Sequence, residues 1–571
     1  MELTIDNIKN ILKDKNKDGS AETLMGEIAF QNRDALKSIA DSANGVTRSN
    51  TKWRRCEYIF ISIRPEERVS MDVCLKGWKA LAQSHADQTL ILEDSFSNWT
   101  IYNYNSEIVG HNEELELLIK KLSEVRNHSV KKFHSTSMGE ITKHHHYFTA
   151  LRTKPFMLLA GISGTGKSRI VRKLAQATVT EELQRANGYT GDDFVNDRWA
   201  LHSPANFELI QVKPNWHNSM DVIGYLSNIP SPHYVFTPFI EFIVKAWQHP
   251  EVPFFLCLDE MNLAPVEEYF AEFLSAIESR SFEGEEYLTD PIIKPFNSFG
   301  TTKEENGVDI NIGDMMIDTL FPKVKASNTN SEILKIKEHF QTKGLTLPKN
   351  LIVIGTVNMD ETTFSFSRKV LDRAMSVEMN EVNYDSFLTD TTDDDLKAIV
   401  KAFEENDEAD LNALLVDRHI EAREIIDDLG DDARFAIDYL KRINALLEGT
   451  PFKLGYRAAN EALIYLQASQ EFGQTDRISA LDNFTLMKIL SRIEGDETKL
   501  KITDSEADKE RIAKAEVNVD EAKQYGDLNI LTALRHIITN QLGEQDKLHS
   551  VKKIDSMLSQ LKRDHFVSFW N

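Results

Sequence analysis

The chain has 571 residues, enough for about two to four domains at roughly 150 residues each. Hydrophobic residues make up 41% and charged residues 27%, a globular balance that excludes wholesale disorder. The 90 acidic and 66 basic residues give a net charge of −24. This charge argues against a protein that coats nucleic acid through its overall field, although it leaves room for a local basic patch.

The sequence offers no membrane or export signal. No apolar run approaches the ~20 residues of a membrane span, and the start, MELTIDNIKN, lacks the basic region and apolar core of a signal peptide. Three cysteines in 571 residues are too few for a disulfide scaffold, and their lack of CxxC spacing argues against structural zinc. We therefore expect a soluble cytoplasmic protein without membrane contact.

Residues 1–105 are expected to form a small α+β domain for recognition or interaction, with a β-branched and aromatic strand at 56–63. The tract from Arg48 to Arg55 mixes basic residues with Trp53. This mixture allows phosphate contact and base stacking on DNA, but a solvated strand edge beside a half-buried Trp explains it more simply. Residues 106–150 carry apolar positions at helical spacing and are predicted to be a helical connector.

Residues 151–380 alternate short apolar runs with helical patterns, which predicts an α/β core around a parallel sheet. The candidate buried strands are 156–160, 207–212, 254–259 and 350–355. Residues 281–349 are too many for an ordinary loop and are interpreted as an insertion on this core. Residues 381–571 are expected to form a helical lid followed by further helices.

The strongest motif is GISGTGKS, which follows an apolar run and precedes an amphipathic helix. It fits GxxxxGK[ST], whose glycines let backbone N–H groups surround phosphates at a helix N-terminus. Lys167 is predicted to reach the β and γ phosphates, and Ser168 to bind Mg²⁺. The predicted nucleotide-binding residues of the motif are Gly161, Ile162, Ser163, Gly164, Thr165, Gly166, Lys167 and Ser168.

Two further strand ends carry polar groups suited to nucleotide hydrolysis. The run FFLCLDEMN delivers Asp259, a predicted Mg²⁺ ligand through water, and Glu260, predicted to polarise the attacking water. The run IVIGTVNMDET ends a buried strand at Asn358, whose amide could reach the γ-phosphate or that water. Paired with the glycine-rich loop, the two carboxylates indicate a catalytic site.

Three arginines follow these motifs. Arg373 is predicted to lie beyond the Asn358 strand, where it could serve a neighbouring subunit as an arginine finger. The alternative is an exposed side chain paired with Asp372 or Glu378, an alternative that we favour for Arg368. Arg457 starts a helix of the following helical domain and could reach back to the nucleotide. Its alternative is a salt bridge with Glu461, four residues further on.

The order of these motifs resembles that of an AAA+ ATPase. VKPNWHNSMDVIGYL (212–226), DEMNLAPVEEYFAEFLSAIES (259–279) and the ending 551–570 resemble McrB-type restriction motors and MoxR-type ATPases, and the resemblance covers about residues 110–571. It implies that Gly161 to Ser168 form the Walker A loop and that Asp259 and Glu260 form Walker B. It also implies sensor 1 at Asn358, the arginine finger at Arg373 and sensor 2 at Arg457.

The McrB resemblance further implies a ring, expected to be a homo-hexamer, that works with a separate nuclease subunit in restriction of foreign DNA. The chain departs from the MNTAD-like signature of McrB GTPases, because VNMDET places its acidic residue early, at Asp360. We therefore expect ATP rather than GTP, together with Mg²⁺. The alternatives are a MoxR-type ATPase that remodels protein complexes and a nucleotide-dependent scaffold in which hydrolysis only times assembly.

Overall fold

The structure is a computed structural model that divides the chain into two compact units, Met1–Thr136 and Ser137–Asn571. The residues that it describes are 60–62, 90–95, 98–103, 108–110, 143–229, 232–283, 286–303, 309–322, 331–358, 366–380, 394–404, 410–474, 476–543 and 547–570. The basic tract from Arg48 to Arg55 and the acidic Asp360 lie outside these residues, as does most of the expected connector.

The first unit contains a four-stranded sheet in the order β1-β2-β3-β4. The strand expected at 56–63 is described over its last part, where β1 pairs in parallel with β2. Strands β2, β3 and β4 follow one another as an antiparallel meander. The four strands are β1 (Phe60–Ser62), β2 (Leu90–Ser95), β3 (Asn98–Asn103) and β4 (Ile108–Gly110).

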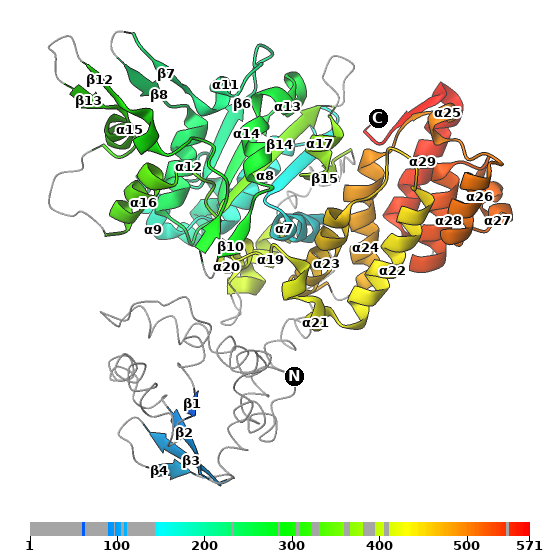
Figure 1. Cartoon of the computed structure of the whole chain (residues 1–571), viewed down its shortest axis with the longest axis horizontal. Helices are drawn as coiled ribbons and strands as arrows, with labels where there is room; N and C mark the ends of the chain where they lie inside the picture. Colours follow the sequence, from blue (N-terminus) through cyan, green and yellow to red (C-terminus); the bar gives the residue numbers. More distant parts are fainter. Residues whose placement is uncertain are drawn as a thin grey trace. The chain divides into compact units, whose positions relative to one another are not determined.

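The second unit is built on a parallel five-stranded sheet in the order β15-β5-β14-β9-β6 (Figure 1). Its strands are β5 (Phe156–Gly161), β6 (Phe207–Gln211), β9 (Phe254–Asp259), β14 (Leu351–Asn358) and β15 (Met375–Glu378). The first four coincide with the predicted apolar runs, which confirms the α/β core. Strand β15, with the sequence MSVE, was not predicted because it is short and alternates apolar with polar residues.

The register of the sheet brings the ends of the strands together. Asn358 at the end of β14 lies opposite Gly161 at the end of β5, and Asp259 at the end of β9 lies opposite Gln211. Glu378, which ends β15, pairs with Ala160. Because all five strands are parallel, their carboxyl ends form one edge, the usual position of a ligand site in an open α/β sheet.

Alternate residues of the strands face two helical layers. Phe156 belongs to a core that includes α12 and α14, and its ring contacts those of Phe270 and Phe273. Helix α8 packs on β5, β9 and β14. The helices and hairpin strands up to residue 276 are α7 (Lys143–Thr153), α8 (Lys167–Thr178), α9 (Glu181–Ala186), α10 (Phe194–Asp197), η3 (Arg198–Ala200), α11 (Met220–Ile223), β7 (Tyr225–Ser227), β8 (His233–Val235), α12 (Pro238–Gln248), η4 (Met261–Leu263), α13 (Val266–Tyr269) and α14 (Ala271–Ala276).

The segment predicted to be an insertion, 281–349, contains two hairpins and two longer helices. Buried Phe296, Met316 and Phe340 join the same hydrophobic core as the sheet, so the described part of this segment packs on the core. Its elements are β10 (Ser281–Glu283), β11 (Glu286–Leu288), η5 (Phe296–Phe299), β12 (Thr301–Lys303), β13 (Asp309–Asn311), α15 (Ile312–Leu320) and α16 (Ser331–Thr342), and α17 (Arg368–Leu371) follows β14.

The C-terminal part is mainly helical, and α23 packs against α7 of the core unit. A small sheet in this part pairs β16 (Glu494–Asp496) with β17 (Phe566–Ser568), so residues 566–568 return to the segment before α25. The helices are α19 (Asp394–Glu404), α20 (Leu411–Val416), η6 (Ala422–Glu424), α21 (Ile426–Leu429), α22 (Asp431–Leu446), α23 (Tyr456–Glu471), α24 (Arg477–Phe484), η7 (Thr485–Ile489), η8 (Leu490–Arg492), α25 (Glu497–Leu500), α26 (Glu506–Lys514), α27 (Val519–Ala522), η9 (Lys523–Tyr525), α28 (Ile530–Leu542) and α29 (His549–Asp564).

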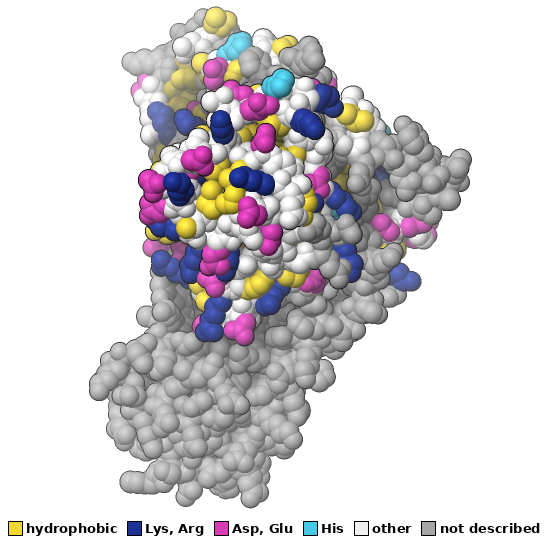
Figure 2. All heavy atoms as spheres, turned by 90° about the vertical axis from the view of Figure 1, so that its right-hand side faces the viewer, with side chains coloured by type: hydrophobic (Ala, Val, Ile, Leu, Met, Phe, Trp, Pro, Cys, Tyr) yellow, Lys and Arg dark blue, Asp and Glu magenta, His cyan; other side chains and the backbone are white. Residues whose placement is uncertain are grey.

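The surface of the second unit is mixed in charge on the face shown in Figure 2, where basic and acidic side chains of the described residues lie interspersed. Such mixing produces no broad field of one sign on this face. None of the helices that the structure describes combines the length and apolar character needed to cross a membrane.

Candidate nucleotide-binding site

The glycine-rich loop connects the end of β5 to the start of α8, as its motif requires. Gly164 and Gly166 have positive φ values of 87° and 83°, which a side chain would disfavour. Gly166 is also the N-cap of α8, so the first free N–H groups of this 12-residue helix adjoin the loop. The backbone therefore forms a curved set of donors beside the positive end of a helix dipole, a setting that suits phosphate groups.

Lys167 lies folded over this loop. Its ammonium donates to the carbonyls of Gly161 over 2.9 Å and Ile162 over 2.8 Å, and the residue is only 6% exposed. Burial lowers the pKa of Lys167, while the charges of Asp259 and Glu260 oppose that shift. The loop thus holds its cation beside the two carboxylates that the sequence placed in the site.

Ser168 and Asp259 are brought together from two different elements. The Ser168 hydroxyl donates to Oδ1 of Asp259 over 2.6 Å. The hydroxyl of Thr356 donates to the same oxygen over 2.7 Å and accepts the backbone N–H of Glu260 over 2.9 Å. Thr356 is 2% exposed and was not predicted. It could have been found from its position two residues before Asn358, because residues i and i+2 of a strand share a face.

Glu260 and Asn358 form the second pair of the site. The amide nitrogen of Asn358 donates to Oε1 of Glu260 over 2.9 Å. Asn262, another residue that was not predicted, donates to the backbone carbonyl of Asn358 over 3.0 Å. Glu260 has a φ of 55°, an unusual value for a residue with a side chain. Backbone strain of this kind accumulates at functional sites, and here it turns the carboxylate toward the end of β14.

The donor set fits a nucleotide with Mg²⁺. A serine hydroxyl and a carboxylate that lie 2.6 Å apart offer the hard oxygen atoms that Mg²⁺ prefers. The cation would be held by Ser168 and Asp259, and the phosphates by the loop and Lys167. Among the described residues, no cluster of three or more His, Cys, Asp or Glu side chains is arranged for another metal.

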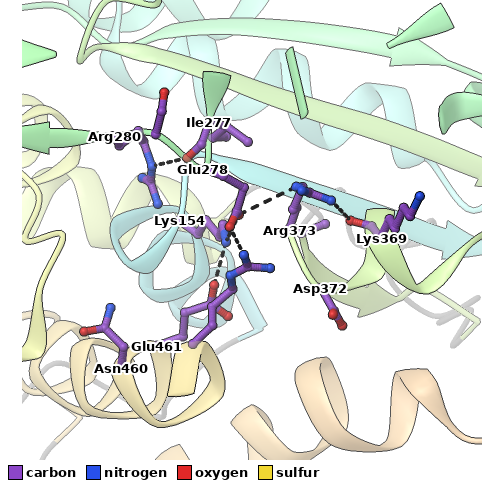
Figure 3. Close-up of polar contacts among 12 residues, drawn as sticks. Lys154, Ile277, Glu278, Arg280, Lys369, Asp372, Arg373, Asn460 and Glu461 are labelled. Atoms are coloured by element: carbon purple, nitrogen blue, oxygen red, sulfur yellow. Dashed lines mark hydrogen bonds and ion pairs between the residues drawn. The ribbon is translucent and has the colours of Figure 1, made fainter. Parts of the chain in front are cut away.

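The two predicted catalytic arginines share the partner Glu278 and do not lie at this edge of the sheet. Figure 3 shows Arg373 beside Glu278 and Lys154. Arg373 precedes β15, donates to the carbonyl of Lys369 over 2.8 Å and places Nε 4.0 Å from Oε1 of Glu278. Arg457 forms an ion pair with the other oxygen of Glu278. Lys154, just before β5, approaches Glu278 to 3.2 Å. The amino ends of β5 and β15 therefore mark the position of this cluster.

The structure does not bring Arg373 or Arg457 to the phosphate loop of the same chain. Lys154 and Gly161 stand at opposite ends of β5, roughly 20 Å apart at the rise of a strand. An arginine paired with Glu278 beside Lys154 is therefore separated from its own loop by the length of the sheet. The expectation that Arg457 reaches back to the nucleotide of its own chain is not met in this conformation.

The alternative partners considered for the arginines are also not those found in the structure. Asp372 pairs with Arg492, and Glu378 pairs with Lys553. Glu461 accepts from Lys154 over 2.6 Å and lies 2.8 Å from Lys488, so Arg457 is paired with Glu278 in its place. Arg368 donates to the carbonyl of Pro451 over 2.7 Å and lies over the ring of Phe452, so it joins α17 to the segment before α23.

The parallel sheet, the glycine-rich loop and the carboxylates at the adjoining strand end are consistent with a P-loop ATPase-like core. In the comparisons with known proteins, one family model, described as a domain of unknown function (DUF8727), matches residues 424–566. No curated protein matches the chain. A crystal structure described as a putative ATPase from Cytophaga hutchinsonii is 13% identical, with 66% of this chain and 91% of that chain covered at a TM-score of 0.32.

Proposed function

We propose that this protein binds and hydrolyses a nucleoside triphosphate, and that it is an AAA+ motor of the McrB-like type. The observation that carries the proposal is the contact between Ser168 of the loop and Asp259 at the end of β9, 2.6 Å apart. This contact joins a phosphate-binding loop to a carboxylate pair, which is the minimum apparatus for phosphoryl transfer to water.

The residues divide the chemistry between them. The loop amides and Lys167 bind and neutralise the phosphates, and Ser168 and Asp259 hold Mg²⁺, which when bound neutralises charge on the phosphate oxygens. Glu260 accepts a hydrogen bond from water and polarises it for attack on the γ-phosphorus. Asn358, which holds Glu260 over 2.9 Å, orients that carboxylate and contacts the water or the γ-phosphate.

Arg373 and Arg457 would complete the site of a neighbouring chain. Both lie at the amino edge of the sheet, away from their own loop, and both share the one acceptor Glu278. An arginine that cannot reach its own nucleotide can stabilise transition-state charge in trans, which requires a neighbouring subunit in contact with the site. We propose a homo-hexamer that drives a separate nuclease subunit in restriction of foreign DNA, with ATP preferred over GTP and target DNA bound through residues 1–105.

A second candidate, a MoxR-type ATPase that remodels protein complexes, is favoured by one specific observation. The β7–β8 hairpin carries Tyr225, Leu226 and Ile229 with exposed fractions of 47%, 37% and 82%. Apolar side chains gathered on a protruding hairpin are typical of protein contact sites. A protein-remodelling ATPase would use this hairpin on its substrate, whereas a restriction motor would be stimulated by DNA and its nuclease.

The test measures equilibrium binding of fluorescent ATP and GTP analogues, and phosphate release, on the purified full chain. Lys167→Ala removes the phosphate contact and is expected to weaken binding at least tenfold. Lys335→Ala, an exposed lysine on α16, serves as the matched control and should bind like the wild type. The proposal is overturned if the wild-type chain binds neither nucleotide, or if Lys167→Ala binds as well as the wild type.

A further inference from the structure

The start of the glycine-rich loop is bound by Asn380, which follows β15, the strand that was not predicted. The backbone N–H of Ile162 donates to Oδ1 of Asn380, just beyond β15, over 3.0 Å. The backbones of Gly161 and Met379 also approach each other closely, because a Cβ atom on Gly161 would lie 2.5 Å from the carbonyl oxygen of Met379. The N–H of Met379 also donates to the carbonyl of Ala160 over 2.7 Å. The first residues of the loop therefore pack against residues 379 and 380.

The orientation of the Asn380 amide is set by Glu378. Oε1 of Glu378 accepts from Nδ2 of Asn380 over 2.5 Å, so the amide nitrogen faces the carboxylate and the amide oxygen faces Ile162. The reversed amide would turn two donors toward the Ile162 N–H and leave no acceptor for it. Lys167 binds the carbonyl groups of Gly161 and Ile162. Asn380 binds the N–H group of Ile162, so the same stretch of the loop is hydrogen-bonded through both its carbonyl and its N–H groups.

Glu378 is in turn held by the C-terminal helices. Nζ of Lys553, on α29, lies 2.8 Å from the same Oε1 atom of Glu378. The side chain of Lys553 is only 11% exposed. Lys553 also lies over the ring of Phe569, 4.6 Å from its centroid, next to β17. One acceptor atom of Glu378 therefore joins the C-terminal helix α29 to the amide that fixes the phosphate loop.

We propose that Lys553, through Glu378 and Asn380, is a positioning residue for the phosphate loop, so that docking of helix α29 against the core sets nucleotide affinity. This inference rests on the proposed nucleotide binding. The two side chains between Lys553 and the loop are in direct contact, and each has its orientation fixed by the next. Because such coupling is reciprocal, nucleotide binding should also stabilise the docked position of α29.

The experiment measures the dissociation constant of a fluorescent ATP analogue for the full-length protein. Lys553→Met keeps much of the side chain's length and removes its charge, and we expect the affinity to fall by roughly 5-fold or more, the lower end of typical couplings between sites. Lys552→Met makes the same change at the next residue, which is exposed, and should leave the affinity unchanged. Lys553→Arg keeps the cation and should recover most of the loss.

A double-mutant cycle separates this path from general destabilisation. If Lys553 acts through Asn380, Lys553→Met should have little further effect on affinity in an Asn380→Ala background, because the intermediate contact is already lost. A merely structural role would lower affinity equally in both backgrounds. Thermal melting without nucleotide identifies any variant that fails to fold, and Lys553→Arg then provides the comparison.

The outcomes distinguish this inference from the function on which it rests. If the wild-type chain binds no nucleotide, the proposed function itself fails. If the wild type binds and Lys553→Met binds equally well, or if the two losses in the cycle simply add, the positioning role of Lys553 is wrong while nucleotide binding stands.

Discussion

The amide of Asn358 donates to the carboxylate of Glu260 over 2.9 Å, although the two residues are 98 positions apart in the chain. They meet because β14 and β9 are neighbours in the parallel sheet and end at the same edge. The contact fixes the carboxylate of Glu260 at the edge where β5 meets the phosphate loop. It therefore joins the residue proposed to polarise water to the residue proposed to sense the γ-phosphate.

Replacing Glu260 should separate binding from hydrolysis. Glu260→Gln keeps the shape of the side chain but cannot accept a proton from water, so hydrolysis should fall by about 10²–10⁴-fold. The affinity for the nucleotide should stay near that of the wild type, because Lys167 and the loop are unchanged. Phosphate release and fluorescent nucleotide binding measure the two quantities. Hydrolysis at the wild-type rate would show that Glu260 is not the catalytic carboxylate.

The hydroxyl group of Thr356 should contribute more to stability and hydrolysis than the shape of the side chain does. Thr356→Val removes the donor to Asp259 and the acceptor for the N–H of Glu260, and leaving buried polar groups unsatisfied costs about 1–3 kcal/mol. We expect a lower thermal midpoint and slower hydrolysis. Thr356→Ser keeps the hydroxyl and is the matched control, expected to stay close to the wild type in both measurements. Equal behaviour of the two variants would mean that the hydroxyl contributes nothing.

Arg373 provides the test of assembly. Arg373→Ala should bind nucleotide nearly normally and hydrolyse it poorly, since one pre-positioned guanidinium can contribute ~10³–10⁵ in rate. Mixing it with Lys167→Ala, also inactive alone, should restore some activity, because an intact loop from one chain then meets an intact arginine from the next.

The control for this mixing experiment is native mass spectrometry, which shows whether both variants enter one ring. If mixed rings form and no activity returns, Arg373 does not act in trans. Arg368→Ala should then be mixed with Lys167→Ala in the same way. Our expectation for Arg368→Ala alone is a weaker effect, because its guanidinium is engaged with the Pro451 carbonyl and the Phe452 ring.

The packing of α23 against the core should depend on Glu461. Its carboxylate lies between Lys154 and Lys488, all of them at most 5% exposed in their side chains. Glu461→Gln leaves the buried ammonium of Lys488 without its anion and leaves Lys154 with Glu278 alone, and breaking a buried ion pair in this way costs about 3–5 kcal/mol. Chemical denaturation at pH 7 measures the loss. Glu506→Gln, on the exposed surface of α26, is the control and should change little.

The same comparison has a defined pH dependence. Burial alone would raise the pKa of Glu461, but the charges of Lys154 and Lys488 outweigh it and lower the pKa from 4.5 to about 2. Stabilisation from a carboxyl whose pKa is depressed is present above the unfolded value and is lost as the pH falls through the folded one. The stability difference between wild type and Glu461→Gln should therefore shrink as the pH falls below about 4.5. A difference that stays the same down to pH 3 would contradict this assignment.

Local sequence patterns were sufficient to predict the site residues that lie in short contiguous runs of the chain. The glycine-rich loop, Asp259 and Glu260 each occupy a short run in which an apolar strand is followed by polar residues, and the parallel sheet makes such strand ends converge. The contact between Ser168 and Asp259 follows from that rule. Strand β15 was not predicted, because four residues with two of them polar carry too little periodicity to stand out.

The sequence by itself determined the α/β core, the phosphate loop and the carboxylates, because these depend on contiguous residues and on strand ends that share one edge. Only the tertiary structure decided which charges meet across the chain. Arg457 pairs with Glu278 rather than Glu461, and Ile162 binds Asn380, 218 positions away. Nothing in local periodicity selects such partners, since they follow from the order of strands in the sheet and from the docking of the C-terminal helices on it.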